Sequence, residues 1–385
     1  MSVSKGDFKG KSNAEWQVKF AVPRSCCLAL VIVGASLWST PASWGEPSDE
    51  TASAGSLENT PAIPSDLEEQ IRTVFDHAKP AVVRIEADHP LGTMSGTGFF
   101  ISPLGVLMTS ASLAVDANSV YVTDGQARYP AIVQLIDPRS GIAILRIAKD
   151  TAHLVASNNP PTVVGTPLLS VGYPMDYPIS PAFGIVAGFD TTFGERILPT
   201  THIRAALPTQ PGQAGAPVLN LKGQLVGIVV TMFANGAGCH VLPIQAAAKV
   251  YEDFLRYGRV MHGWVGVTVD EAEEPVGGSR AVIVDLVEKT PAALSGLRNG
   301  DVVLRVGKVA IRRPMDIIDA SYFLTAGDDV LVGVMRDGVE MDFHVEPTYH
   351  PALARFQPVG APAMLPSGGV ILTLKPAENA PIATP

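Results

Sequence analysis

The chain has 385 residues, which is longer than one ordinary domain and predicts two or three domains. Hydrophobic residues make up 46% of the sequence, enough to give each domain a packed core. The formal net charge of −9 argues against a nucleic-acid partner, because such proteins present a basic face to the phosphates. The eight histidines lack the spacing of metal ligands, so we expect neither a metal ion nor a cofactor.

The first 45 residues have the composition of an export signal. Basic residues precede an apolar run at residues 26–37 (CCLALVIVGASL), and small residues follow it. The run is shorter than the roughly 20 residues of a spanning helix, which favours a cleaved signal peptide over the alternative, an N-terminal anchor. Either reading predicts an exported protein of the periplasm or cell envelope. Cleavage would leave Cys239 as the single cysteine of the mature chain, so no internal disulfide is expected.

Residues 46–64 are rich in Ser, Pro, Glu and Thr and predict a flexible linker. Residues 65–80 (SDLEEQIRTVFDHAKP) then predict a short amphipathic helix that stops near its proline. Twelve short β-rich runs follow, six up to residue 148 and six from residue 167, separated by turn residues. Such even spacing predicts two small β-barrels packed together.

Two features close this unit. The runs VLNL and QLVGIVV predict a hairpin with a two-residue turn at Lys222–Gly223, and residues 244–258 predict an amphipathic helix. A further unit from about residue 261 shows strands, a short helix at 291–297, a second helix at 314–325 and a final hairpin. The remaining residues are rich in Pro, Gly and Ala and predict a largely disordered tail, in which GGVILTL could add an edge strand or pair with a partner.

Three motifs resemble those of the HtrA/Deg family of exported chymotrypsin-like serine proteases. They are GTGFFISPLGVLMTSASLAV with DPRSGIAILRI, then QPGQAGAPVLNLKGQLVGI, then GWVGV with TPAALSGLRNGDVVLRV. The resemblance implies an all-β fold with a small α contribution, in which a double six-stranded β-barrel at residues 65–258 precedes one PDZ domain at 259–347. Residues 1–45 are then the signal or anchor, 46–64 the linker and 348–385 the tail.

The three catalytic positions of the family have lost their chemical groups. The histidine position falls on Ser112, the aspartate position on Gly141 and the serine position on Ala214, and we call these the triad positions. A serine protease needs a hydroxyl, an imidazole that takes its proton and a carboxylate that orients the imidazole. We therefore expect a catalytically inactive pseudoprotease, not an enzyme, with Gly212 and Gln213 as a remnant oxyanion loop. The alternative is a serine-type endopeptidase of envelope protein quality control with a non-standard active site.

Other groups could substitute for the triad. Candidates are Ser110, Ser112, Asp137, His202 and His240, and the simplest interpretation of each is a surface or turn residue. Neighbours on a strand point to opposite faces, so Cys239 and His240 are not expected to form a dyad. Residue 216, a glycine in the family motif, is alanine here, and its methyl group is harmless only if φ is negative.

The PDZ resemblance implies a peptide-binding groove. In this fold, backbone N–H groups of the GWVGV loop capture a C-terminal carboxylate, and the peptide adds as a strand along the following residues. The implied partners are polypeptide C-termini or unfolded segments, a related active protease, and further copies of the chain in a homotrimer. The predicted peptide-binding residues are Trp264, Val265, Gly266, Val267, Thr268, Val269, Ile317, Ala320 and Ser321.

Overall fold

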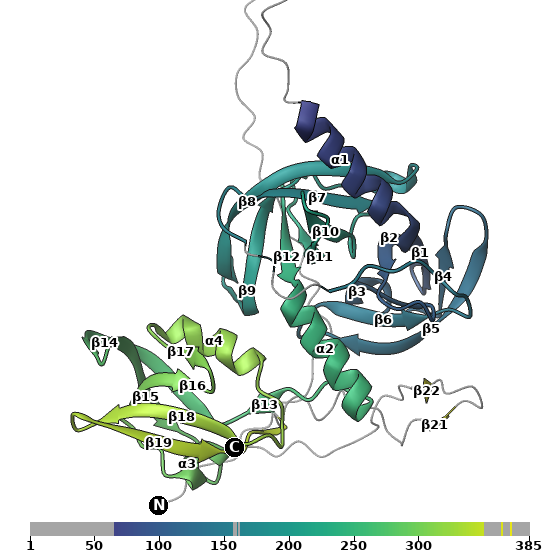
Figure 1. The fold of residues 1–385 in the computed structure, drawn as a ribbon. Helices are drawn as coiled ribbons and strands as arrows, with labels where there is room; N and C mark the ends of the chain where they lie inside the picture. The colour runs from purple at the N-terminus through teal and green to yellow at the C-terminus, as the bar shows by residue number, and fades with distance from the viewer. Residues whose placement is uncertain (1–64, 157–159, 161, 350–362, 365–369, 372–385) are drawn as a thin grey trace, which may run out of the picture. The chain divides into compact units, whose positions relative to one another are not determined.

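The computed structural model describes residues 65–156, 160, 162–349, 363–364 and 370–371. The predicted leader, the linker and most of the tail lie outside the described residues. Within the described part, two closed β-barrels precede a sheet that carries its own helices (Figure 1). None of the helices in these ranges has the length and apolar character that crossing a bilayer requires.

The first barrel closes in the order β1-β2-β3-β6-β5-β4, and the second in the order β10-β11-β12-β9-β8-β7. The two barrels that the sequence predicts are therefore present. The strands of the first barrel are β1 Val82–His89, β2 Gly92–Phe100, β3 Val106–Ser110, β4 Ser119–Thr123, β5 Arg128–Asp137 and β6 Ile142–Arg146. Those of the second are β7 Pro167–Gly172, β8 Ser180–Phe193, β9 Arg196–Ala206, β10 Pro217–Asn220, β11 Leu225–Met232 and β12 Cys239–Pro243.

Alternate residues of these strands belong to two different hydrophobic cores, one inside each barrel and one between the two barrels. Phe100 belongs to the buried cluster of the first barrel, whereas its neighbour Phe99 belongs to a cluster that strands of both barrels share. In the second barrel, Val218 lies in the barrel's own cluster and Leu219 in the shared one. Successive side chains on a strand point to opposite faces, so one face fills the barrel and the other packs the two barrels together.

The β10–β11 hairpin differs from its predicted two-residue turn. Asn220 pairs with Gln224 through the Asn220 N–H and through both side-chain amides, so the loop holds three residues, 221–223. Gly223 takes a φ of +74°, which glycine adopts without steric cost. The extra residue is of the kind that a glycine bulge accommodates.

Two helices flank the barrels. The first, α1 Ser65–Ala78, packs Val74 and Ala78 into the shared core and gives way to a single 3-10 turn at Lys79–Ala81, where Pro80 ends the α-helical pattern. The second, α2 Ile244–Tyr257, ends at Gly258, whose φ of +69° places it in the left-handed conformation of a helix C-cap. Both helices therefore lie where the hydrophobic periodicity predicts them.

The C-terminal domain is a sheet with the order β14-β15-β16-β18-β19, in which β14 is an edge strand. The helix α4 ends at Tyr322, three residues before the predicted end. A short strand β20 pairs with β13 just past residue 347, where we expected the tail to begin. The elements are β13 Gly263–Trp264, β14 Val267–Val276, β15 Ser279–Leu286, α3 Pro291–Ser295, β16 Val302–Val306, β17 Val309–Ala310, α4 Pro314–Tyr322, β18 Val330–Arg336, β19 Val339–Val345 and β20 Thr348–Tyr349. In the tail, β21 Ala363–Met364 pairs with β22 Val370–Ile371, within the predicted apolar run.

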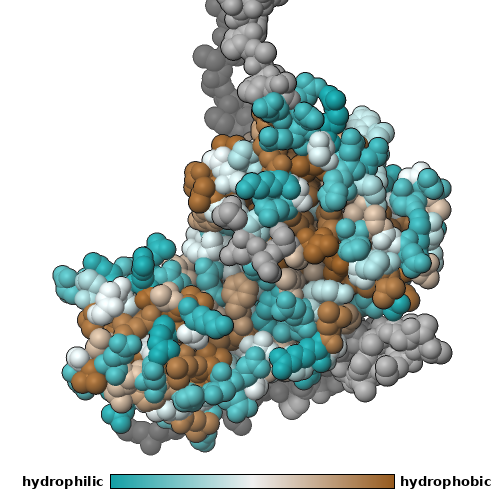
Figure 2. Space-filling view, viewed as in Figure 1, coloured by the Kyte–Doolittle hydropathy of each residue, from teal (hydrophilic) through white to brown (hydrophobic). Residues whose placement is uncertain are grey.

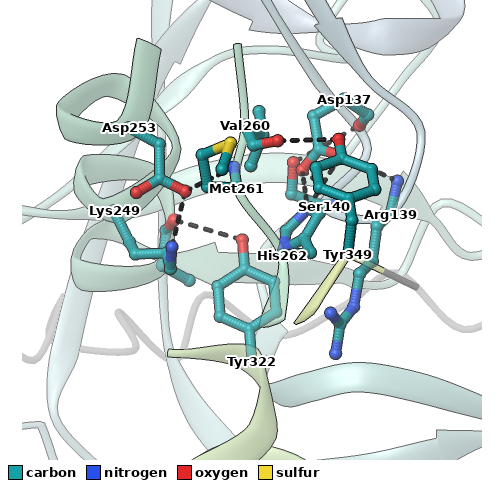
Figure 3. Close-up of polar contacts among 11 residues, drawn as sticks. Asp137, Arg139, Ser140, Lys249, Asp253, Val260, Met261, His262, Tyr322 and Tyr349 are labelled. Carbon is teal, nitrogen blue, oxygen red and sulfur yellow. Dashed lines mark hydrogen bonds and ion pairs between the residues drawn. The ribbon is translucent and has the colours of Figure 1, made fainter. Parts of the chain in front are cut away.

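A buried carboxylate joins the first barrel to the segment that enters the C-terminal domain (Figure 3). Asp137, at the end of β5, accepts hydrogen bonds from the backbone N–H groups of Arg139 and Ser140. Both of its oxygens also lie 3.1 Å from His262 Nε2. A carboxylate only accepts hydrogen bonds, so Nε2 carries the proton. Asp137 and His262 are 4% and 2% exposed, and the pair is shielded from water.

A second set of buried contacts lies on α2. The Lys249 ammonium donates to Asp253 over 2.5 Å and to Thr325 Oγ1 over 3.0 Å, and Asp253 also accepts from the Met261 N–H. The Tyr322 hydroxyl donates to the carbonyl of Ala246 (Figure 3). These bonds satisfy polar groups that burial would otherwise leave without partners.

Asp137→Asn should lower the free energy of unfolding by about 1–3 kcal/mol, because it weakens several hydrogen bonds to one buried charge. Burial raises the pKa of Asp137, but the hydrogen bonds from His262 and Ser140 outweigh burial and hold the pKa below its ordinary value of 3.8. The stability from this carboxylate is therefore complete above the unfolded-state pKa and is lost as the pH falls through the lower folded-state pKa.

Thermal melts of the wild type and Asp137→Asn from about pH 7 down to about pH 2.5 check this. The gap in Tm should be constant above about pH 5 and shrink below about pH 4. Asp342→Asn removes an exposed partner of Arg305 and should change stability by less than about 1 kcal/mol. Equal effects of the two variants would contradict the role given to Asp137.

Candidate functional site

A glycine-rich loop at residues 212–216 leads into β10 and is fastened to the first barrel. The Thr97 N–H donates to the carbonyl of Ala214 over 2.9 Å, and the Thr97 hydroxyl donates to the carbonyl of Gly212 over 2.7 Å. Gly212 and Gly215 take φ values of +93° and +84°, which bend the loop back on itself. A Cβ at Gly215 would lie 2.2 Å from the Thr97 carbonyl oxygen, so the loop packs directly on β2.

Two backbone N–H groups of this loop lack partners. Among the hydrogen bonds of the described residues, none is donated by the N–H of Gly212 or of Ala214. The Gln213 N–H, in contrast, donates to the carbonyl of Gln210 over 3.1 Å, and the Gln213 side chain accepts from the Gln210 N–H. The donors that could stabilise an oxyanion are therefore those of residues 212 and 214, not that of the predicted Gln213.

The alanine at position 216 is compatible with the loop. Its φ is not among the positive values, and its N–H donates to the carbonyl of Gln213. Its methyl group is fully buried and would lie 3.3 Å from a Cβ placed at Gly172. The methyl group of Ala216 is therefore harmless, because the condition of a negative φ at this position is met.

The three triad positions lie in adjoining turns. The Ala111 N–H, next to Ser112, donates to the carbonyl of Gly141 over 2.8 Å. On the other side, a Cβ at Gly215, next to Ala214, would lie 2.7 Å from the backbone nitrogen of Ser110. Gly141 has a φ of +76°, and only Val230 would come within 4 Å of an added Cβ there. These contacts bring residues 112, 141 and 214 into neighbouring turns, where they present a hydroxyl, a hydrogen atom and a methyl group.

The hydroxyl pair of Ser110 and Ser112 is the polar feature of this cleft. The two oxygens lie 2.9 Å apart, Ser110 is buried and Ser112 is exposed. A hydroxyl of this kind is a weak nucleophile at neutral pH unless a base removes its proton. The pair can hydrogen-bond a substrate, and Ser112 presents an oxygen to solvent beside the loop.

The other candidate residues form a buried cluster in the second barrel. His240 Nε2 lies 2.9 Å from Asp190, and its ring packs edge-on against Phe193 and Phe233. His202 contacts the carbonyl of its neighbour Thr200, and burial holds the pKa of His202 below its ordinary value. Both imidazoles are at most 3% exposed, so neither is presented to a substrate.

The single cysteine of the described residues is buried and unreactive at neutral pH. Cys239 lies in the core of the second barrel, and burial raises the pKa of its thiol to about 12. A thiol with that pKa carries almost no thiolate near neutral pH, so it is neither a nucleophile nor a metal ligand there. The described ranges also hold no group of three or more His, Cys, Asp or Glu side chains placed to bind a metal ion.

A pocket of about 380 Å³ lies in the C-terminal domain between the start of β14 and α4. Figure 2 shows hydrophobic side chains at the surface of this domain among polar ones. The predicted residues that line the pocket are Trp264, Val265, Gly266, Val267, Ile317 and Ser321. Residues that the sequence reasoning missed are Arg139, Gly263, Ile318 and Leu324.

Three predicted residues lie elsewhere. Val269 lines a small apolar cavity of about 50 Å³ beneath the pocket. Thr268 is exposed on the edge strand, where an incoming strand would pair with it. Ala320 is 3% exposed and belongs to the domain's core, so it supports the groove and does not line it.

The loop at the mouth of the pocket has free donors. The carbonyl groups of this loop accept hydrogen bonds: that of Val265 from the Ala292 N–H, and that of Gly266 from the Val287 N–H. Among the described residues, no hydrogen bond is donated by the N–H of Val265 or Gly266. Gly266 has a φ of +81°, which turns the backbone at this point. Successive free N–H groups in such a turn form an anion-binding concavity.

Comparisons with known proteins agree with both halves of this architecture. Residues 96–228 match the trypsin-like peptidase domain, and residues 263–346 match the PDZ domain. A protein of Pseudomonas fluorescens named "Probable periplasmic serine endoprotease DegP-like" is 28% identical over 290 residues, which cover 71% of this chain and 60% of the relative. A protein of the same name from Chlamydia muridarum is 26% identical over 272 residues, covering 67% and 54%.

Solved structures show the same fold. The HtrA-type protease AlgW with a tripeptide has a TM-score of 0.63 and 21% identity, covering 73% of this chain and 97% of that one. A serine endoprotease from Yersinia pestis has a TM-score of 0.56 and 22% identity, covering 73% and 98%. The chain belongs to the HtrA family. Its predicted chymotrypsin-like double barrel and PDZ domain are thereby confirmed. The chain spans little more than half the length of the curated relatives that it matches.

The expectation that this HtrA chain is not an enzyme is contradicted. Its curated relatives are named serine endoproteases, and its structural neighbours are HtrA-type proteases. The prediction of an inactive protein was wrong because the absence of the serine hydroxyl, the imidazole and the carboxylate excludes only the standard triad mechanism. It does not exclude chemistry by other groups of the same cleft, such as the unpaired N–H groups of Gly212 and Ala214.

Restoring the three groups together tests the assignment of the triad positions. The triple variant Ser112→His, Gly141→Asp, Ala214→Ser should hydrolyse unfolded casein at least on the order of 10²-fold faster than the wild type, because general acid–base catalysis contributes about 10²–10⁴-fold. A fluorophosphonate should label it at position 214. Ala214→Ser alone should gain nothing, since no base lies beside the new hydroxyl. A folded triple variant that stays unlabelled would show that the positions are misassigned.

Proposed function

We propose that this chain is an HtrA-type protein that captures polypeptides by their C-termini in the groove between β14 and α4. The observation that carries the proposal is the pair of free N–H groups at Val265 and Gly266, at the mouth of an apolar pocket and beside an edge strand. A terminal carboxylate would accept these donors, an apolar side chain would fill the pocket, and the peptide backbone would extend the sheet.

The proposal includes an exported location. The apolar leader of the sequence and the relatives named periplasmic both support the periplasm or cell envelope. Whether the leader is a cleaved signal or an anchor stays open, and so does the predicted homotrimer. The proposed ligands are C-termini of unfolded or damaged envelope proteins, or of a related protease. The domain boundaries at residues 65–258 and 259–347 belong to the same proposal.

Ile317→Glu tests the groove. The side chain lines both the pocket and the cavity beneath it, so a carboxylate there would repel the carboxylate of the ligand. Fluorescein-labelled decapeptides that share a polar body and end in Ala, Val, Leu, Ile or Phe serve as probes. We expect the best of them to lose at least about 30-fold in affinity, measured by fluorescence anisotropy, because like charges brought together cost several kcal/mol.

The matched control is Val284→Glu, which places the same charge on an exposed position of β15 in the same domain. This variant should bind the peptide as the wild type does. A substitution at Gly266 would be a poor test, because a Cβ there would lie 2.5 Å from Thr290 and would strain the positive φ. Unchanged affinity in Ile317→Glu would remove the groove as the binding site.

A second function is supported by the comparisons. We propose a serine-type endopeptidase of envelope protein quality control with a non-standard active site, because the relatives carry that activity in their names. In this cleft the unpaired N–H groups of Gly212 and Ala214 would stabilise an oxyanion. The Ser112 oxygen would attack the carbonyl carbon, its proton would pass through the Ser110 hydroxyl to the departing amine as the C–N bond breaks, and water would then hydrolyse the ester. Captured peptides would be the substrates.

Hydrolysis of unfolded casein by the purified chain tests the second function. Without the imidazole, an oxyanion site and substrate binding give on the order of 10³–10⁴-fold over water, so slow cleavage is expected. Ser112→Ala should slow it to the level that the oxyanion site and binding alone sustain, whereas Ser102→Ala, in the turn after β2, should leave it unchanged. Cleavage that is indistinguishable from buffer in the wild type would refute this function and leave peptide capture untouched.

A further inference from the structure

An arginine of the first barrel reaches the peptide pocket of the PDZ domain. Arg139 lies in the turn between β5 and β6, close to Asp137 and Ser140 (Figure 3). Its side chain lines the pocket together with the loop at residues 263–267. Its Nη2 lies 3.5 Å from Ser321 Oγ, at the margin of hydrogen bonding, and its guanidinium carbon lies 5.4 Å from the centre of the Tyr322 ring. The pocket is therefore built from both domains.

The Asp137 carboxylate attracts this guanidinium, but burial outweighs that attraction and lowers the pKa of Arg139. In the described ranges no carboxylate lies within ion-pair distance of Arg139, although other arginines of the chain, such as Arg336 with Asp301, are paired. The lowered pKa means that the surroundings of Arg139 disfavour its charge. A cation that is partly withdrawn from water and unpaired is costly unless a ligand supplies the opposite charge.

The position of Arg139 is fixed from its backbone. Its N–H and that of Ser140 donate to the Asp137 carboxylate, which also accepts from His262. His262 directly precedes Gly263, the first residue of the loop that carries the free N–H groups. The buried Asp137 carboxylate thus contacts both the backbone of Arg139 and the histidine that precedes the loop at residues 263–267.

We propose that Arg139 binds the C-terminal carboxylate of the captured polypeptide, together with the backbone N–H groups of Val265 and Gly266. This inference rests on the proposed peptide-binding function and adds a residue from outside the PDZ domain to it. Arginine presents a planar fork of donors that matches a carboxylate. The trypsin-like domain would then select for a free C-terminus, and internal segments without a carboxylate would bind weakly.

The experiment compares peptides that differ only in the terminal group. The decapeptides above are used as free acids and as C-terminal amides, with the wild type, Arg139→Gln and Arg139→Lys in the full chain. A hydrogen bond to a charged group contributes about 1.5–3 kcal/mol, so Arg139→Gln should weaken binding of the best acid by about 10- to 100-fold. Affinity for the amide should change by less than about twofold, so the preference for the acid falls. Arg139→Lys should lie between, because it keeps the charge and loses the fork.

The matched control is Arg312→Gln, which removes the same charge from an exposed site next to α4. It should bind acid and amide as the wild type does. Two failures are distinguishable. If the wild type binds none of the acids, the proposed function fails and this inference with it. If the wild type binds an acid, and Arg139→Gln binds it equally or loses acid and amide alike, the arginine has only a packing role on Tyr322 and the inference is overturned.

Discussion

The buried carboxylate of Asp137 is the constraint on which the working parts of this chain depend. It accepts two backbone N–H groups of its own turn and the imidazole of His262, so it is fully hydrogen-bonded although only 4% exposed. A buried charge is stable only with such partners. Losing any one of the three donors would leave the Asp137 carboxylate with too few hydrogen bonds. The same contacts set the backbone of residues 137–141 and the entry into the PDZ loop. A single group thereby determines the relation of two sites that are far apart in the sequence.

The cleft of the double barrel keeps its backbone arrangement with a small side chain at the centre of its loop. The backbone of residues 212–216 keeps its two positive φ values, its anchor on Thr97 and its unpaired N–H groups. These features come from glycines and from strand packing, so a side chain can be lost at position 214 without disturbing them. Acid–base chemistry resides in side chains alone, and that part is altered. Oxyanion stabilisation depends on backbone N–H groups and activation of a nucleophile depends on side chains, so the two can be lost separately.

Much of the fold follows from the sequence because it is encoded locally. Strand alternation, turn residues and helix periodicity place both barrels, α1 and α2, and the GWVGV motif places the peptide loop. The predicted hairpin turn was one residue too short, because an Asn220–Gln224 pair closes a three-residue loop that no two-residue pattern reveals. Gly212 and Gln213 were predicted as the oxyanion loop, and the sequence could not show which of its N–H groups are free, because the Gln213 N–H turns back to Gln210. Ala320 was predicted to line the groove since helical spacing allows it, but the sheet lies on that side.

Arg139 was beyond the reach of such reasoning, because its role depends on contacts across more than a hundred residues of sequence. In the sequence DPRSGIAIL, Arg139 has the features of an ordinary arginine in a turn. Its proximity to Ser321 is visible only in the folded chain. Its turn also carries Gly141, one of the triad positions, two residues further on. An anion bound at Arg139 would act on the same short backbone segment that shapes the cleft beside Ala111. Linkage is reciprocal: if an anion at Arg139 changes the affinity of the cleft for a substrate by some factor, the substrate changes the affinity of the groove by that factor. The turn of residues 137–141 therefore contacts both sites, through Gly141 on one side and Arg139 on the other.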